Sequence, residues 1–365
     1  MTAIPLPMAL VAEVTHRCPL RCPYCSNPLE MARASEEVST ADWSRLFSEA
    51  ADLGVLHLHL SGGEPMARSD LAELVRAASA AGLYVNLITS GVMLDAAKMA
   101  ELADAGLDHV QLSFQHADTA EAERIGGMRG AQARKLAAAH LVTAAGLPLT
   151  CNFVIHRQNA REVTRMIALG AALGAQRVEI AHTQYYGWGL INRDALLPDE
   201  DDLRHATAAV DAGRTLHAGR MAIDYVTPDY YGDQPKACMD GWARRFIIVG
   251  PRGQAMPCHA AETIPGLVFP DIRAHSLRDI WHDDPTFRRF RGTDWMPDPC
   301  QSCALKEKDW GGCRCQALAL AGDAAATDPV CARSPKHDVM QSLIAARASE
   351  PPDFIFRHNA KPASP

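Results

Sequence analysis

Residues 17–27 read RCPLRCPYCSN, and this stretch decides how the rest of the chain is interpreted. It sets Cys18, Cys22 and Cys25 in a C-x3-C-x2-C spacing, directly after an apolar run at residues 9–14. Thiolates are soft ligands that suit iron–sulfur clusters or zinc. A [4Fe–4S] cluster takes four ligands and this loop offers three, which leaves one iron free for an exogenous molecule. The alternative is structural zinc, which normally has four protein ligands.

The first half of the chain alternates short apolar runs with longer amphipathic stretches. Strands are expected at residues 9–14, 55–60, 83–89, 109–114, 149–155 and 177–181. Helices are expected between them at residues 40–51, 70–81, 96–105, 131–145 and 160–173. This alternation predicts an α/β fold with parallel strands and right-handed crossovers. Six such units fit an open doubly wound sheet or a partial barrel, and periodicity does not choose between the two.

A second motif follows the second expected strand and consists of Gly62, Gly63, Glu64 and Pro65. Glycine lets the backbone approach a ligand, and a carboxylate accepts hydrogen bonds from an ammonium group. Alone the motif indicates only a turn, but here it lies at the end of the strand that follows the cysteine loop, where α/β folds build active sites. Further polar residues end the third and fourth strands and either face the same ligand or are ordinary polar residues of a barrel mouth: Ser90, Gly91, Ser113 and Gln115.

The chain changes character after residue 185. A helix is expected at residues 203–214 and a strand at 221–226, and from residue 233 onward turns prevail. We expect this part to bury little apolar surface and to depend on a bound metal. Residues 349–365 carry four prolines and are expected to form a frayed tail.

Most of the remaining cysteines lie in the last third of the chain. A chain with eleven cysteines, of which ten lie in two clusters and are expected to be reduced, is more often a metal protein than a disulfide scaffold. A zinc ribbon is the alternative, because C-x2-C pairs are common zinc ligands. Cys151 stands apart and is expected to be core. The cysteines of the second cluster are Cys238, Cys258, Cys300, Cys303, Cys313, Cys315 and Cys331.

The cysteine loop, with Tyr24 before its last cysteine, resembles the signature of radical S-adenosylmethionine (SAM) enzymes. In that family the open iron of a [4Fe–4S] cluster chelates SAM, and cleavage of SAM gives a 5′-deoxyadenosyl radical. The GGEP segment of the family contacts the amino group of SAM. The resemblance implies a partial (βα)6 barrel of the TIM type, and so chooses the barrel. It divides the chain into a barrel at residues 1–190, a connection at 191–235, a cysteine-rich domain at 236–335, and a C-terminal helix and flexible tail at 336–365.

The second cysteine cluster resembles the SPASM domain, which carries auxiliary clusters in peptide-modifying radical SAM enzymes. This chain departs from the family pattern at Asp309, where a cysteine is usual. The resemblance implies two auxiliary clusters, [4Fe–4S] or [2Fe–2S], with eight ligands in all. Alternatively, Asp309 is a surface acid and one iron is open. The implied sets are Cys300, Cys303, Asp309 and Cys331 for one cluster, and Cys238, Cys258, Cys313 and Cys315 for the other.

Four longer runs, at residues 17–30, 182–188, 257–266 and 307–318, resemble the peptide cyclases of pyrroloquinoline quinone (PQQ) biosynthesis. That resemblance implies a carbon–carbon bond between a Glu γ-carbon and a Tyr ring carbon of the precursor peptide PqqA. It also implies a peptide chaperone, PqqD, and a flavodoxin-type electron donor. Other SPASM enzymes, which make thioethers or mature sulfatases, and a non-catalytic metal-binding module are the alternatives.

The run at residues 182–188 is expected at the barrel mouth. His182, Gln184, Tyr185 and Tyr186 either line a substrate channel and move a proton, or pack against the cysteine-rich domain. Asn152 and His156, in and just after the fifth strand, carry the same two interpretations.

The composition of the chain gives no reason to expect a nucleic-acid or membrane partner. The 365 residues carry a net charge of −7, with 48% hydrophobic and 22% charged residues. A net negative chain gives no reason to expect nucleic acid. No apolar run is long enough to cross a bilayer, and residues 1–13 lack the features of a secretory signal. We therefore expect a cytoplasmic protein without a membrane partner.

Overall fold

The structure is a computed structural model, and it describes residues 4–227 and 229–357. One sheet of nine strands forms its centre, in the order β7-β6-β5-β4-β3-β2-β1-β8-β9. Neighbouring strands run parallel except for β9, which is antiparallel to β8. The strands are β1 (Ala9–Thr15), β2 (His57–Gly62), β3 (Tyr84–Thr89), β4 (His109–Phe114), β5 (Leu149–Ile155), β6 (Arg177–His182), β7 (Ala222–Val226), β8 (Phe246–Val249) and β9 (Ala255–Met256).

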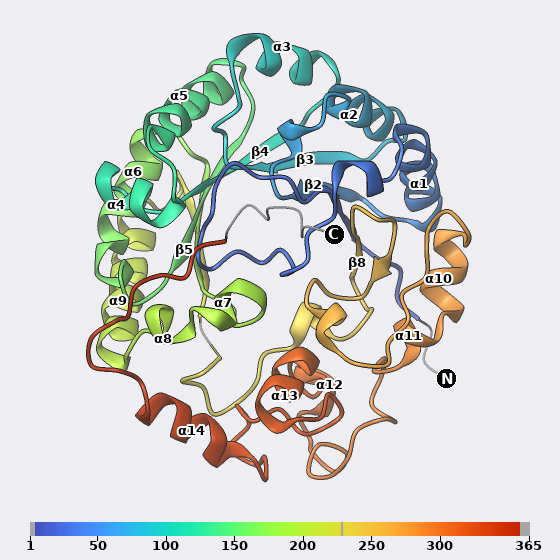
Figure 1. The fold of residues 1–365 in the computed structure, drawn as a ribbon, viewed down its shortest axis with the longest axis vertical. Helices are drawn as coiled ribbons and strands as arrows, with labels where there is room; N and C mark the ends of the chain where they lie inside the picture. Colours follow the sequence, from blue (N-terminus) through green and yellow to red (C-terminus); the bar gives the residue numbers. More distant parts are fainter. Residues whose placement is uncertain (1–3, 228, 358–365) are drawn as a thin grey trace, which may run out of the picture.

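Helices cover the outside of this curved sheet (Figure 1). The arrangement is the partial barrel expected from the sequence, and the six strands predicted for the first half are all present. The outer helices are α1 (Thr40–Leu53), α2 (Leu71–Ala80), α3 (Ala96–Asp104), α4 (Thr119–Gly126), α5 (Ala131–Ala144), α6 (Val163–Ala172) and α9 (Glu200–Leu216), with the short helices α7 (Gly187–Ile191) and α8 (Arg193–Leu196) near the mouth.

Helix α1 shows why these segments are helical. The Ser39 side chain accepts a hydrogen bond from the Asp42 backbone N–H and so caps the N-terminus, and Gly54 ends the helix in the left-handed region. Trp43, Leu46, Phe47, Ala50 and Leu53 recur at helical spacing and are buried. The helix therefore presents one apolar stripe to the sheet.

In strand β4, buried residues alternate with residues that line a cavity. Val110, Leu112 and Phe114 are buried in the hydrophobic core, whereas Gln111 and Ser113 alternate with them and line a cavity. Alternate residues of a strand face opposite sides of the sheet. The barrel interior is therefore polar, and the space between sheet and helices is apolar.

The second half buries more apolar surface than the sequence predicted. Strand β8 pairs with β1, with Ala9 opposite Phe246 and Ala12 opposite Val249. Trp281, Ile247 and Phe287 are fully buried in the same core as Leu10. The expectation of little burial was wrong because it treated this stretch as a separate unit, while strand pairing lets it share the core of the barrel. Its helices are α10 (Leu277–Asp283), α11 (Pro285–Arg288), α12 (Lys306–Asp309), α13 (Arg314–Ala321) and α14 (His337–Ala345).

The C-terminal segment also differs from the expected frayed tail over residues 349–357. Ile355 exchanges hydrogen bonds with the Asn192 side chain, at 2.7 and 2.9 Å. Arg357 is buried and donates to the carbonyls of Cys18 and Leu20. The segment runs from α14 toward the barrel mouth (Figure 1). The rest of the predicted tail, residues 358–365, lies outside the described residues, and the predicted domain boundaries stay predictions.

Among the described residues, no helix has both the length and the apolar content that crossing a bilayer requires.

Candidate active site

The three cysteines of the opening motif lie together at the mouth of the barrel. Cys18, Cys22 and Cys25 all line one cavity of about 380 Å³, which the ends of β2 to β6 also line. The predicted residues that share this cavity are Tyr24, Gly62, Gly63, Ser90, Ser113, Gln115 and His182. The structure thus brings most of the predicted SAM site to one place.

These thiols are buried enough to disfavour the thiolate. Burial raises the pKa of Cys18 to about 12 and that of Cys25 to about 11, and it also raises the pKa of Cys22. Metal ligation requires deprotonated thiols, and metal binding supplies the positive charge that stabilises them. Three thiolates in this loop fit a metal cluster.

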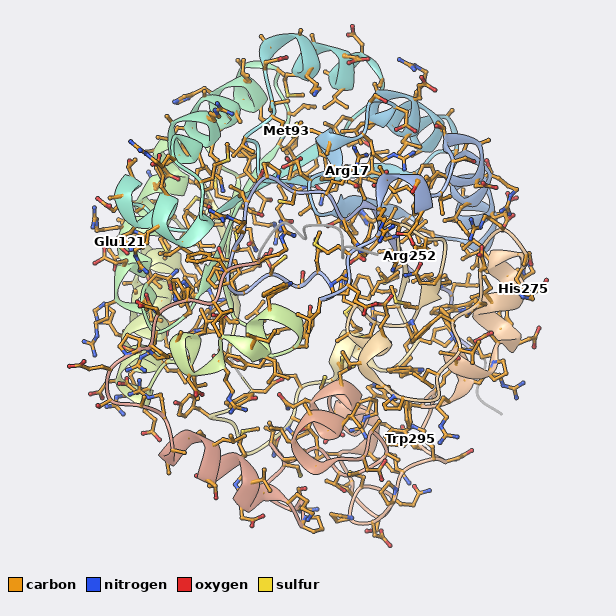
Figure 2. The ribbon with its side chains drawn as sticks, viewed as in Figure 1. Arg17, Met93, Glu121, Arg252, His275 and Trp295 are labelled. Carbon is orange, nitrogen blue, oxygen red and sulfur yellow. The ribbon has the colours of Figure 1, made fainter. Side chains whose placement is uncertain are left out.

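Ion pairs fix the base of the cysteine loop. The Arg17 guanidinium lies 3.0 Å from the Glu37 carboxylate, and Arg68 lies 3.6 Å from the same carboxylate. Arg68 is buried and also donates to the carbonyls of Val14 and Val38. Figure 2 shows Arg17 inside the ring of outer helices. The loop is therefore anchored where it leaves β1.

The two glycines of the second motif let this segment pack against the cysteine loop. The Gly63 N–H donates to Thr15 O at 2.6 Å, and the Glu64 N–H donates to Arg17 O at 2.7 Å. A Cβ at Gly63 would lie 2.4 Å from His16 O, and one at Gly62 would lie 2.2 Å from Thr15 O. The close approach that glycine permits is thus backbone to backbone, and both glycines still line the cavity.

Glu64 is fully buried, and its carboxylate has its partners within the fold. One oxygen accepts from Thr89 Oγ1 at 2.6 Å and from the Met66 N–H, and the other accepts from the N–H and hydroxyl of Ser90. Glu64 therefore ties the end of β2 to the end of β3. Neither Glu64 nor Pro65 is among the residues that line the cavity, and the predicted contact of the motif with an ammonium group stays a prediction.

His182 lies between this cavity and a second one of about 430 Å³, and it lines both. Its Nε2 is 3.0 Å from the Tyr225 hydroxyl, and its Nδ1 is buried without a hydrogen-bond partner in the described structure. Burial lowers the pKa of His182 to about 4, with a smaller contribution from Lys236, so the ring is neutral near pH 7. Thr183, Gln184 and Tyr186 also line both cavities.

Tyr185 differs from its neighbours in the run at residues 182–186, and its predicted role stays a prediction. It lines only the second cavity and packs edge-on against Tyr230, with ring centroids 4.8 Å apart. Burial raises the pKa of its hydroxyl well above the usual value, so it is a neutral phenol.

Four cysteines line the second cavity: Cys238, Cys258, Cys313 and Cys315. Interactions with Cys238 and Cys315 hold the pKa of Cys258 and that of Cys313 well below the usual value. The Cys258 and Cys315 sulfurs are 4.0 Å apart. The four expected ligands of one auxiliary cluster are thus gathered at a single cavity.

A third, smaller cavity collects the other expected set, Cys300, Cys303, Asp309 and Cys331. One oxygen of Asp309 accepts from the Gly311 N–H at 2.9 Å, and the side chain is only partly exposed. As the side chains stand, no three His, Cys, Asp or Glu residues of the described part converge tightly enough to hold a single metal ion. The donors surround small cavities instead.

Comparison with known proteins follows the same two parts. Residues 12–170 match the Radical SAM superfamily, and residues 238–304 match the SPASM iron–sulfur cluster-binding domain. A protein of Granulibacter bethesdensis named PqqA peptide cyclase is 59% identical over 357 residues, which cover 98% of this chain and 96% of the relative. A protein of Gluconobacter oxydans with the same name is also 59% identical, over 98% of this chain and 99% of the relative.

The chain belongs to the PqqA peptide cyclase family. It is a radical SAM enzyme with a SPASM domain, as the sequence predicted, and its first cofactor is a [4Fe–4S] cluster with SAM.

Two solved structures with bound S-adenosylmethionine share the fold of this PqqA peptide cyclase family member. Streptococcus suis SuiB bound to S-adenosylmethionine gives a TM-score of 0.74 at 21% identity, over 89% of this chain and 77% of SuiB. The enzyme anSMEcpe with bound AdoMet gives 0.64 at 15% identity, over 93% of this chain and 98% of that one. At these identities the likeness describes the fold.

The sequence interpretation missed one acid of this cyclase-family barrel. Glu179 on β6 lines the first cavity. Its carboxylate accepts hydrogen bonds from the side-chain amides of Gln111 and Asn152. Burial raises the pKa of its carboxyl group. The signal was its place in the middle of a strand, where alternation turns it inward, but a single polar residue in a strand carries no motif.

Proposed function

We propose that this chain joins the γ-carbon of a Glu side chain to a ring carbon of a Tyr side chain in the precursor peptide PqqA, early in PQQ biosynthesis. The curated relatives named PqqA peptide cyclase support the substrate. The observation that carries the proposal is the segment at residues 182–186, which separates a cysteine-lined barrel cavity from a cavity lined by four further cysteines. Radical formation and removal of an electron then have adjacent sites.

The chemistry of the substrate explains the need for two sites. The hydrogens on a Glu γ-carbon are too weakly acidic for ordinary acid–base catalysis, and a radical is the accessible route. Bound together, the [4Fe–4S] cluster and SAM supply a 5′-deoxyadenosyl radical. After hydrogen abstraction and addition to the ring, the peptide must lose one electron and one proton to restore aromaticity. In this proposal the neutral His182 takes that proton, and its buried Nδ1, which has no partner in the described structure, supports the role.

We further propose two auxiliary clusters in the SPASM part. The set of Cys238, Cys258, Cys313 and Cys315 would hold the cluster that faces His182 and would accept the electron. The other set would include Asp309, whose oxygen is a harder ligand than sulfur and shifts the reduction potential. Asp309→Cys tests this role by potentiometry of the auxiliary signals. Unchanged potential and unchanged activity in that variant contradict ligation by Asp309.

Family membership also suggests the partners. We propose that the chaperone PqqD presents the precursor peptide and that a flavodoxin-type protein delivers the electron.

The deciding experiment is anaerobic incubation of the enzyme with SAM, reductant, PqqA and PqqD, followed by mass spectrometry. We expect the peptide to lose two hydrogen atoms and to yield a crosslinked Glu–Tyr fragment. A crosslink at Cys would instead favour a thioether-forming SPASM enzyme. Zinc without sulfide in the anaerobically purified protein would contradict any radical SAM activity.

The matched control replaces Cys18, Cys22 and Cys25 together by Ala. This variant should lose SAM cleavage and retain the auxiliary iron and sulfide. Continued turnover without the three cysteines would overturn their role.

A further inference from the structure

Lys135 is buried on the inner side of α5, and no carboxylate among the described residues forms an ion pair with it. Lys135 has no exposed surface, and its Nζ donates to Ser113 O at 2.7 Å and to Gln115 Oε1 at 2.5 Å. The Phe114 ring lies on another side, 6.0 Å from Nζ. A buried ammonium group is costly unless a negative charge compensates it.

The groups whose negative charge would stabilise the Lys135 ammonium belong to the SAM site. They are Cys22 and Cys18, once they are thiolates, and the buried carboxylate of Glu64, and each raises the pKa of Lys135. Burial is the larger influence and lowers the pKa of Lys135 to about 8. The charge that would compensate this lysine is therefore the thiolate charge of the cysteine loop.

Gln115 connects the lysine to the loop. An ammonium group only donates hydrogen bonds, so the Gln115 atom that faces Lys135 must be the amide oxygen. The amide nitrogen then points to the other side, where it lies 3.7 Å from the Cys22 sulfur. Gln115 is itself buried, so water does not compete with Lys135 for its amide group and the amide keeps this orientation. The result is a chain of donors that ends on one cluster ligand.

We propose that Lys135, acting directly by its charge and through Gln115, is the counter-charge of the SAM-binding cluster and raises its reduction potential. Reduction adds one negative charge to a cluster, and a buried positive charge stabilises the reduced form more than the oxidised form. Hydrogen bonds to cluster sulfurs act in the same direction. Lys135 and Gln115 are positioning residues here. The inference rests on the family's cofactor and is independent of the peptide that the enzyme modifies.

The test is potentiometric titration of the holoenzyme, followed by electron paramagnetic resonance, for the wild type and Lys135→Met. We expect the ratio of reduced to oxidised SAM-binding cluster, at fixed solution potential, to fall by roughly tenfold, which is about 59 mV for one electron. The auxiliary clusters serve as an internal control and should keep their potentials. Lys135→Arg, which keeps the charge, should restore much of the difference.

Gln115→Glu is the second variant. It keeps an acceptor for Lys135 but puts a negative charge where the amide nitrogen was, so the potential of the same cluster should fall again. A structural role of Lys135, as a tie between α5 and β4, predicts lower thermal stability and an unchanged potential. An unchanged midpoint in Lys135→Met with all clusters retained would overturn the proposal. If that variant does not fold, an unchanged midpoint in Gln115→Glu overturns it.

Discussion

Gly63 occupies a position at which no side chain fits. Its N–H and that of Glu64 donate to the backbone at the base of the cysteine loop, and this pairing brings the two chains too close for a Cβ. The motif that suggests SAM recognition therefore also has a structural role, because it packs against the cysteine loop. Gly63 lines the cavity and also holds the metal-binding loop against the end of β2.

Gly63→Ala tests whether this close packing holds the cysteine loop in place. The added Cβ would lie 2.4 Å from His16 O and 2.5 Å from Arg17 O, and both atoms are backbone. Overpacking of this kind costs about 1–3 kcal/mol. We expect a lower midpoint of thermal unfolding and less iron in the SAM-binding cluster, measured by electron paramagnetic resonance.

Gly126→Ala is the matched control, because its Cβ would meet Gln115 at an ordinary contact distance of 3.6 Å. This variant should keep both properties. Full iron content in Gly63→Ala would show that the loop tolerates displacement.

The elements differ in how far the sequence could predict them. Strands β4 and β5 have the predicted bounds, because long apolar or alternating runs between helices define them locally. Strand β9 has two residues and β8 has four, and neither has a pattern of its own. They form because β1 offers an edge to β8, and pairing of this kind depends on residues more than 200 positions away.

The candidate site divides in the same way. Motif spacing predicted the first cysteine set, and the resemblance to the SPASM domain implied the other two. The residues of each set line one cavity. Lys135 and Glu179 were missed because each is one polar residue in an otherwise ordinary helix or strand. The C-terminal segment was missed because four prolines and few apolar residues predict a tail. Its order comes from tertiary contacts that no local pattern encodes.

The segment at residues 349–357 acts as a strap over the cysteine loop. Asn192 donates to both Pro23 O in the loop and Ile355 O in the strap. Phe354 packs edge-on against His156, and His156 packs against Tyr24. The strap thus reaches the loop through three side chains as well as through Arg357.

Arg357→Met should loosen the loop. The guanidinium donates to Cys18 O at 3.1 Å and to Leu20 O at 2.5 Å, and Met cannot replace these bonds. Each unsatisfied buried carbonyl costs about 1–3 kcal/mol. We expect faster loss of iron from the SAM-binding cluster in the presence of a chelator, with the auxiliary signals unaffected.

Arg220→Met is the control, since Arg220 is exposed and donates to the carbonyl of Leu216 in its own neighbourhood. If Arg357→Met and the wild type lost iron to the chelator at the same rate, the contacts of Arg357 would not be needed to hold the cysteine loop.

At the scale of the whole molecule, the two halves share one core. Helix α10 packs against α1, and the Trp281 indole N–H donates to Pro5 O at 3.0 Å. Arg252 from the second half pairs with Glu36 from the first at 3.2 Å, and Figure 2 shows Arg252 within the ring of elements. The SPASM part therefore completes the barrel edge and cannot be treated as an appended module.

Trp281→Ala tests whether the halves unfold together. Trp281 is fully buried in the common core, and truncation of a buried Trp costs about 3–5 kcal/mol. Because the residue lies in the second half, independent domains would leave the barrel unaffected. We expect instead one transition at a lower temperature, with the signals of the SAM-binding cluster and the auxiliary clusters lost together under anaerobic heating. Leu216→Ala, at a 67% exposed position, should leave the midpoint unchanged. Two separate transitions, with the SAM-binding cluster retained at its original temperature, would refute a shared core.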